Sequence, residues 1–487
     1  MTGPTRLLAL VLILVAPVLL VRSPAPAPAQ EDPLPPSPIS EEHAEGFELV
    51  GHHPLGSRGM NAAIAMYGDY AYIGNRTDGS GNHPMPGVLV ADVSDPATPE
   101  VVGEIGPPNE GNPGETSREL RVWPEEKLLL VLNFRCEQQS HACNGPSVPP
   151  TIRFYDLTGA NAASPLLVAT YPLPLLPHEM FLWTDGDERA LLYLSAWKAG
   201  VAGPDLIVTD ISRAREGVFS EVASWNGNSR FSSAFRSQNV VRLHSMGVSA
   251  DGTRTYVAYQ GAGFLILDSS DVAAGFPSPE LRLLTPIGSQ PTWGSPGAHS
   301  AIEVPERDLA LTTDEVYGNR PGGGFQSLGC PWGWLRLIDT SDEAAPTVVG
   351  EYKIPQNEAA YCGSVEGSDP LDTWFTSYSS HNPTIARGIA FVTWHSGGLH
   401  AISLKDPSQP ERVGVYLPRP LPTVATEDPA LSSGRNKVVM WSYPIVHRGL
   451  IYVIDLRNGL YVLRYTGPNA NKVAKVRFAE GNSYLGD

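Results

Sequence analysis

Four histidines recur at one position of a repeating pattern in this chain. Each lies at or just before the start of an apolar segment with strand character, in the tetrapeptides PHEM, LHSM, AHSA and SHNP: His178, His244, His299 and His381. Neutral imidazoles and carboxylates bind divalent transition metals, with copper, zinc, iron or manganese as the candidates. The sequence therefore predicts a metal or ligand site where these segments meet. The alternative is a structural hydrogen bond to a neighbouring element, copied four times by repeat duplication.

Further polar side chains lie close to these positions in the pattern. Glu179 follows His178 directly, Asp314 and Glu315 lie in TTDEVYG, and His395 follows an apolar run in TWHSGG. We expect Glu179, Asp314, Glu315 and His395 to lie beside the four histidines, as ligands, as hydrogen-bond partners of ligands or as proton carriers. The sequence contains neither a Gly-x-Ser-x-Gly elbow nor a His-Glu-x-x-His motif.

The segments that carry these residues belong to an internal repeat. An alternating strand followed by a turn recurs in GVLVADVSDP, TIRFYDLTG, DLIVTDISR, GFLILDSSD, WLRLIDTSD, HAISLKDP and GLYVLRYTGP. Residues 379–418 contain a complete unit, which reads as four strands joined by tight turns. Successive copies are 54 to 71 residues apart, longer than the ~40–45 residues of a compact propeller blade. The pattern predicts an all-β, seven-bladed β-propeller with insertions in its loops.

The two ends of the repeat array predict how the ring closes. The last unit lacks a clear fourth strand, whereas FELVG at residues 47–51 resembles the fourth strands PEVVG and PTVVG. We expect this N-terminal strand to complete the last blade and so remove an exposed edge. The propeller domain then covers residues 46–468, and the tail 469–487 has no assigned place. In this topology the start of each innermost strand and the end of each second strand lie at one face, where the polar residues converge.

The first residues have the pattern of an export signal. Arg6 precedes an apolar run at 7–21, and the small residues of 27–29 form a cleavage site, so residues 1–30 read as a signal peptide. An uncleaved anchor is the weaker interpretation, because the run is short and interrupted by a proline. Residues 31–45 read as a Pro/Ala-rich linker. A secreted or periplasmic protein is predicted, monomeric and without a membrane span after cleavage.

The charge balance and the cysteines agree with export. The formal net charge is -17, and removal of residues 1–30 takes away Arg6 and Arg22 but no acid. Nucleic acid is therefore not an expected partner. Four cysteines in an exported chain predict two disulfides with three possible connectivities. We expect Cys136 to pair with Cys143 inside one inserted loop, and Cys330 with Cys362 between two neighbouring blades.

The repeats resemble a known family. The runs GVLVADVSDPATPEVVGEI, WLRLIDTSDEAAPTVVGEY and HSGGLHAISLKDPSQPERVGVY are similar to the LVIVD-repeat family of exported, mainly bacterial β-propellers. The resemblance covers about residues 47–467 and implies the propeller fold. The architecture is more remotely similar to the selenium-binding protein and methanethiol oxidase propellers. That similarity implies a histidine-bound metal.

Two functions from different classes are consistent with these observations. One is a non-catalytic binding scaffold whose loops hold a protein, a glycan or a small molecule, with a His-rich ligand or metal site in its central channel. The other is a metal-dependent periplasmic or extracellular oxidoreductase that uses the histidine cluster. Metal analysis of protein purified without a histidine tag distinguishes them, because near-stoichiometric metal favours the enzyme.

Overall fold

The computed structural model describes Met1 and residues 39–106, 114–136, 142–145, 148–186, 189–196, 203–238, 241–293, 297–320 and 328–483. The chain divides into two units, Met1–Asp32 and Pro33–Asp487, and all the elements given below belong to the second. Apart from Met1, the predicted signal peptide lies outside the described residues. Within the described part of the chain, no helix combines the length and the apolar character needed to cross a membrane.

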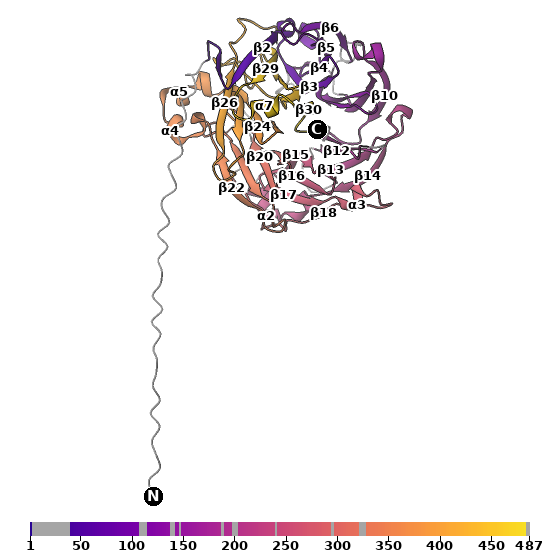
Figure 1. Cartoon of the computed structure of the whole chain (residues 1–487), viewed down its shortest axis with the longest axis vertical. Helices are drawn as coiled ribbons and strands as arrows, with labels where there is room; N and C mark the ends of the chain where they lie inside the picture. Colours follow the sequence, from indigo (N-terminus) through magenta and orange to yellow (C-terminus); the bar gives the residue numbers. More distant parts are fainter. Residues whose placement is uncertain are drawn as a thin grey trace. The chain divides into compact units, whose positions relative to one another are not determined.

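The protein is almost entirely β-structure, and in chain order its strands fall into six runs of four and a last run of three (Figure 1). The first three runs are β3(Asn61–Tyr67), β4(Tyr70–Asn75), β5(Val88–Asp92), β6(Glu100–Ile105); β7(Glu115–Trp123), β8(Leu128–Arg135), β9(Thr151–Asp156), β10(Leu166–Pro172); and β11(Pro177–Thr184), β12(Ala190–Ala196), β13(Leu206–Asp210), β14(Ser220–Trp225). The fourth and fifth are β15(Arg242–Val248), β16(Arg254–Gln260), β17(Gly263–Asp268), β18(Arg282–Leu283); and β19(Ala298–Glu303), β20(Leu309–Asp314), β21(Leu335–Asp339), β22(Thr347–Tyr352). The last two are β23(Pro383–Ala386), β24(Ile389–Trp394), β25(Gly398–Ser403), β26(Glu411–Leu417); and β27(Ile445–His447), β28(Leu450–Asp455), β29(Gly459–Tyr465).

The remaining elements are short. Three further strands lie near the two ends of the chain: β1(His43–Glu45), β2(Phe47–His53) and β30(Phe478–Ala479). The helices lie in connections between strands: α2(Ser233–Gln238), α3(Ser270–Ala273), α4(Ala359–Cys362), α5(Val365–Ser368), α6(Pro370–Thr373) and α7(Ala470–Val473).

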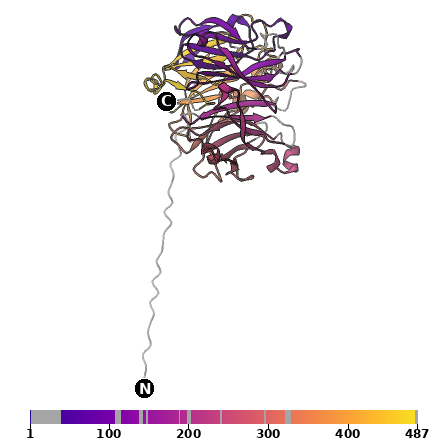
Figure 2. The same ribbon diagram turned by 90° about the vertical axis from the view of Figure 1, so that its right-hand side faces the viewer.

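Within each run, consecutive strands pair antiparallel, as short turns between them require. The first and second runs join into one eight-stranded sheet through the pairing of Asn75 with Ser117. Figure 1 shows the runs following one another around a centre, and Figure 2 shows the same strands from the side. The first strand of each run lies nearest to the centre, so that β7 contacts both β3 and β11, and β15 contacts both β11 and β19.

The sheets are held together by packing across their faces. Strands in the middle of a run, such as β8, are buried on both faces because each run packs between two other runs. Outer strands such as β10 are partly exposed. One buried cluster joins the first and second runs through Val90 and Val131. Another joins the first run to the last, where Ile73 packs with Ile454 and Val462. Each of the seven core clusters lies between two neighbouring runs.

The N-terminal strands complete the last two runs. β2 pairs antiparallel with β29, with Phe47 opposite Tyr465 and His52 opposite Tyr461. Phe47 is buried and its ring contacts those of Phe391 and Tyr465. β1, in the stretch where composition predicts a linker, pairs with β26 as a fifth strand. The end of the linker is therefore part of the folded unit.

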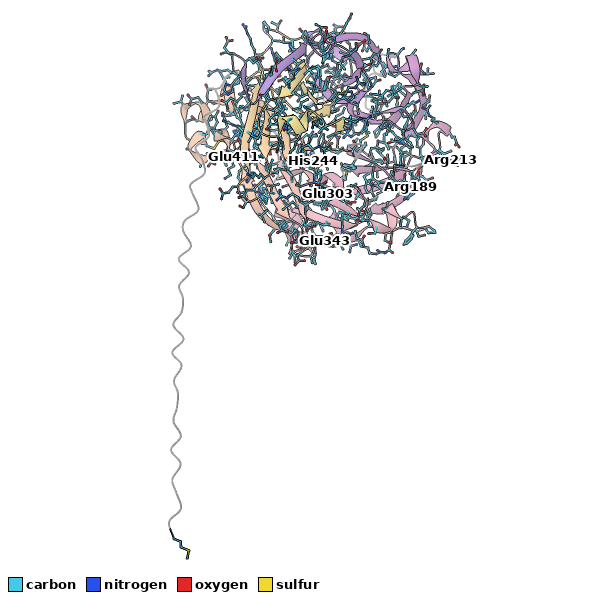
Figure 3. The ribbon with its side chains drawn as sticks, viewed as in Figure 1. Arg189, Arg213, His244, Glu303, Glu343 and Glu411 are labelled. Carbon is cyan, nitrogen blue, oxygen red and sulfur yellow. A yellow bond between two sulfur atoms is a disulfide. The ribbon has the colours of Figure 1, made fainter. Side chains whose placement is uncertain are left out.

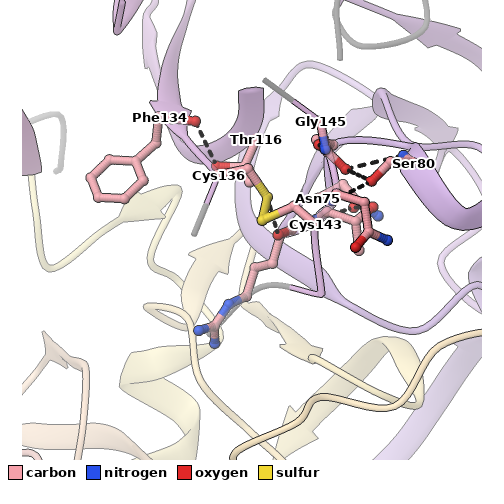
Figure 4. Close-up of a disulfide and its surroundings, with 11 residues drawn as sticks. Asn75, Ser80, Thr116, Phe134, Cys136, Cys143 and Gly145 are labelled. Atoms are coloured by element: carbon pink, nitrogen blue, oxygen red, sulfur yellow. Dashed lines mark hydrogen bonds between the residues drawn. A yellow bond between two sulfur atoms is a disulfide. The ribbon is translucent and has the colours of Figure 1, made fainter. Parts of the chain in front are cut away.

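Two disulfides fasten long insertions. Cys136 and Cys143 are joined with Cα atoms 6.0 Å apart (Figure 4), in the loop between β8 and β9. Cys330 and Cys362 are joined with Cα atoms 5.5 Å apart, and they connect the β20–β21 loop to α4. Two disulfides fit an exported protein.

We predict that the pairing of β2 with β29 carries much of the stability of the last run. Phe47→Ala should lower the free energy of unfolding by about 3 kcal/mol, because it leaves a cavity beside the rings of Phe391 and Tyr465. Glu48→Ala, which removes only an exposed ion pair with Arg464, should cost less than ~1 kcal/mol. Equilibrium urea unfolding measures both. Equal losses in the two variants would contradict a structural role for β2.

Candidate functional site

The predicted histidines lie at irregularities of the first strands. His178 lies in β11, His244 in β15 and His299 in β19, and in each strand the pairing register shifts at that residue. A bulge of this kind turns a side chain away from the regular alternation of the strand. His381 lies two residues before β23, where its backbone N–H donates to the carbonyl of Thr393. All four side chains consequently reach the centre of the molecule, where Figure 3 labels His244.

The four histidines form a continuous buried row. The Nε2 atoms of His178 and His244 are 2.9 Å apart. Ring centroids are 4.0 Å apart for His244 and His299, and 3.9 Å apart for His299 and His381. None of these side chains is more than 2% exposed. The structure thus brings together all four histidines that the sequence analysis selected.

Glu315 lies at the centre of this row. It directly follows β20, and its carboxylate oxygens lie 3.4 Å from His244 Nε2, 3.9 Å from His299 Nε2 and 3.2 Å from His381 Nε2. The Tyr317 hydroxyl donates a hydrogen bond of 2.6 Å to the same carboxylate. One carboxylate and three imidazole nitrogens therefore point toward one small volume.

The other three residues expected near the histidines have different places. His395 lies beside His381, with ring centroids 4.5 Å apart. Glu179 is buried next to His178, and its carboxylate lies within 4.8 Å of nitrogen atoms of His178 and His244. Asp314 points elsewhere, because its carboxylate accepts hydrogen bonds from Arg336 at 2.7 Å and from the Trp293 indole at 2.6 Å. Neighbouring residues of a strand face opposite sides of the sheet, so Asp314 and Glu315 cannot both reach the centre.

Hydrogen bonds orient the imidazoles. The Nδ1 atoms are engaged outside the row: that of His381 with the Trp441 carbonyl at 2.7 Å, that of His395 with the Ser377 hydroxyl at 2.8 Å, and that of His299 with the Ser300 hydroxyl at 2.8 Å. The Nε2 atoms of His299 and His395 have no hydrogen-bond partner among the described residues. Engagement of Nδ1 by the protein leaves Nε2 available as a ligand atom.

Burial favours the neutral form of four of these imidazoles, those of His178, His244, His299 and His395. Burial lowers the pKa of His244 to about 4, although the Glu315 carboxylate opposes this shift. Burial, and then a neighbouring imidazole, holds the pKa values of His178, His299 and His395 well below their usual range. Burial alone would raise the pKa of Glu315, but His299, His244 and His381 outweigh it and lower that pKa. A carboxylate among neutral imidazoles is the protonation state that binds a metal.

Two arginines also reach this region, and the sequence analysis did not select them. Arg118 occupies in β7 the position that His178 occupies in β11, again at a register shift. Arg76 directly follows β4, just as Glu315 follows β20 and His395 follows β24. Their positions in the repeat were the available signal, but their residue type did not match a metal ligand.

The C-terminal tail occupies the centre farther along the first strands. β30 pairs with β27 near the centre (Figure 1), and the carbonyl of Asn482 accepts hydrogen bonds from Leu182 N–H and from Arg121 Nε. Burial raises the pKa of Glu480 in this segment to about 7. A cavity of about 660 Å³ borders Phe478 and Glu480, and its lining includes no histidine.

We predict that the histidine cluster makes stability pH-dependent. Because the folded pKa of His244 lies below its ordinary value of ~6.5, the unfolded chain binds more protons between pH 6.5 and 4. Relative to His244→Gln, chelator-treated wild-type protein should lose free energy of unfolding as pH drops from 6.5 toward 4, by about 3 kcal/mol. Glu480, whose raised pKa acts in the opposite direction, is present in both proteins and cancels in this difference. Urea titrations of both proteins from pH 7.5 to 4.5 measure it. Equal pH dependence in the two proteins would show that His244 titrates normally.

Comparison with known proteins finds a known repeat in two parts of the chain. A model of the LVIVD repeat matches residues 58–105 and 244–274. A search of the curated proteins found no match, so the remoter similarity to selenium-binding propellers stays a prediction.

Solved structures give a further comparison. Sqt1 of Saccharomyces cerevisiae is 8% identical to this chain, and the alignment covers 85% of this chain and 98% of that chain with a TM-score of 0.49. The WD40 β-propeller domain of Doa1 is 11% identical, with 86% and 97% covered and a TM-score of 0.44. The chain contains LVIVD repeats at residues 58–105 and 244–274, within antiparallel strand runs that follow one another around a centre.

Proposed function

We propose that this protein binds a divalent transition metal ion in its central histidine cluster, and that this centre is its functional site. The observation that carries the proposal is the position of Glu315, whose carboxylate lies within 3.9 Å of three imidazole Nε2 atoms. A buried carboxylate is costly unless it is paired. Neutral imidazoles can donate hydrogen bonds to this carboxylate but carry no charge. A metal ion would supply the positive charge that offsets it.

The residues present fit such an ion. Three overlapping groups place their possible ligand atoms within 4.8 Å of one another: His178, Glu179 and His244; His244, His299 and Glu315; and Glu315, His381 and His395. We infer that one of these groups, made of His244, His299 and Glu315, holds the ion, with His381 beside it on the Glu315 carboxylate. Mixed imidazole and carboxylate ligands are compatible with copper, zinc, iron or manganese.

The protein residues around the ion would have distinct roles. When bound beside Glu315, the metal would supply Lewis-acid or redox chemistry within the row. Tyr317 holds Glu315 in place through its hydroxyl. Burial, with Glu119 adding to it, raises the pKa of Glu179 well above its usual range, which favours the protonated form of its carboxyl group. We assign Glu179, beside His178, as the residue that supplies a proton to a bound ligand.

We further infer that the seven runs form one closed seven-bladed ring, completed by β2, in a protein exported to the periplasm or outside the cell. The core cluster shared by the first and last runs and the pairing of β2 with β29 support closure. The two disulfides support an oxidising compartment.

The second candidate is a non-catalytic scaffold that binds a protein or a glycan at the cell surface. The burial of the cluster favours it, because a substrate has to reach side chains that are at most 2% exposed. A metal in the cluster would then stabilise the ring and take no part in chemistry. An oxidoreductase requires that the loaded metal change oxidation state during turnover, whereas the scaffold requires only that the ion remain bound.

Metal analysis tests the proposal directly. Protein purified without a histidine tag should contain about one transition metal ion per chain, or take one up after incubation with Zn²⁺ or Cu²⁺. The paired variant His299→Gln with His381→Gln should weaken binding at least ~100-fold, since even a partner outside the ligand set contributes 10–100-fold. His447→Gln, which bonds the distant Gly68 carbonyl, is the matched control. Absence of metal from the loaded wild-type protein would overturn the proposal.

A further inference from the structure

Arg118 is a buried cation that lies against aromatic rings. Its side chain is 6% exposed, and its guanidinium carbon lies 5.2 Å from the Phe134 ring centroid and 5.1 Å from that of Trp441. Its Nε atom has no hydrogen-bond partner, and no carboxylate forms an ion pair with it among the described residues. The adjacent Glu119 does not compensate it, because that carboxylate pairs with Arg121 at 3.2 Å.

Arg76 approaches the same indole. It is 3% exposed, and its guanidinium carbon also lies 5.1 Å from the Trp441 ring centroid. Its Nε and Nη1 atoms have no hydrogen-bond partner among the described residues, and its ion pair with Asp428 is long, at 3.7 Å. Two buried guanidinium groups with unused donors therefore share one aromatic surface.

This pair of arginines lies next to the metal cluster. The Trp441 ring centroid is 5.2 Å from that of His381, and the Phe134 ring centroid is 6.0 Å from that of His178. The arginines thus contact the rings that border the two ends of the histidine row. The Cys136–Cys143 disulfide also lies here, since Cys136 Sγ is 3.8 Å from the Arg76 carbonyl oxygen (Figure 4).

The charges around the cluster do not balance without a further anion. Neutral imidazoles and the single carboxylate of Glu315 leave a bound divalent ion with a net positive charge, and Arg118 adds another. Buried charges are stable when they are paired and hydrogen-bonded. The guanidinium group has five donors in a planar fork, which suits the two oxygens of a carboxylate, phosphate or sulfate.

We propose that Arg76 and Arg118 bind the anionic group of the ligand that reaches the histidine cluster, and that this group is a carboxylate or another oxyanion. The proposal rests on the proposed function only in placing the metal beside the anion. Arg118 and Arg76 would hold the oxygens of this anionic group, and a metal ion held by Glu315 and the histidines would add its positive charge on the other side. Trp441 provides a flat apolar wall for the remainder of a small molecule.

Titration calorimetry with acetate, phosphate and sulfate tests the proposal and distinguishes carboxylate from phosphate or sulfate recognition. Each probe is added to chelator-treated and to Zn²⁺-loaded protein after long equilibration, because the site is buried. We expect saturable binding of at least one probe, tighter in the loaded protein. Arg118→Met and Arg76→Met should each weaken that binding at least ~10-fold, since each removes a forked charge-assisted contact, while the zinc content stays at the wild-type level.

Two further variants keep the test decisive. Arg118→Lys preserves the charge and the aliphatic stem, so it should fold even where the methionine variant fails, and it should still lose several-fold in affinity because an ammonium lacks the fork. Arg213→Met is the control, since Arg213 is exposed (62%) at the rim (Figure 3).

The outcomes separate the two proposals. Wild-type protein that binds none of the probes, or Arg118 and Arg76 variants that bind them with unchanged affinity, would overturn the anion proposal. Anion binding without zinc uptake would instead overturn the metal proposal and leave this one supported.

Discussion

The packing of each sheet between two neighbours is the constraint on which the rest of this structure depends. A four-stranded sheet whose strands are apolar on both faces cannot be stable alone, because one face would always remain in water. Here every core cluster is shared by two runs, and one of them joins the first run to the last. The strands at the two ends of the chain are consequently brought together, and β2 covers the edge of β29. No single run can be removed without exposing two apolar faces.

The same packing concentrates polar residues at the centre. Repeat-equivalent positions of the first strands all face inward, so a residue type that recurs in the repeat becomes a cluster in space. In a regular strand the side-chain direction simply alternates between the two faces of the sheet. The register shifts at His178, His244 and His299 are bulges, which change the direction of these side chains relative to that alternation. The row is buried, and burial lowers the pKa values of His178, His244 and His299 while the neighbouring imidazoles lower that of Glu315. Burial and pairing together therefore set the protonation state of the site.

The centre contains two polar layers of different composition. β7 contributes to both, because Arg118 lies beside the histidine row and Arg121, three residues later, bonds the C-terminal tail. In the second layer Arg121 pairs with Glu119, and Glu480 enters from the tail. Through Asn482 the tail bonds Leu182 and Arg121, farther along the first strands than the histidine row. Arg76, Glu315 and His395 lie at the other end, each at the start of the loop that follows a second strand.

The sequence by itself determined the elements and the recurrence of the histidines, because strand alternation and turn residues are local and a repeat can be recognised without coordinates. It could also select Glu315 and His395, since both follow second strands. It could not separate Glu315 from Asp314, because the choice depends on which face of β20 meets the centre and on the presence of Arg336 on the other face. The repeat also put Arg118 at the position that the histidines occupy in their units. The sequence could not give a role to Arg118 or Arg76 or a place to the tail, because these depend on Trp441 and Asn482, remote in the chain. Such contacts form only when distant runs pack around one centre, and only the tertiary structure decides them.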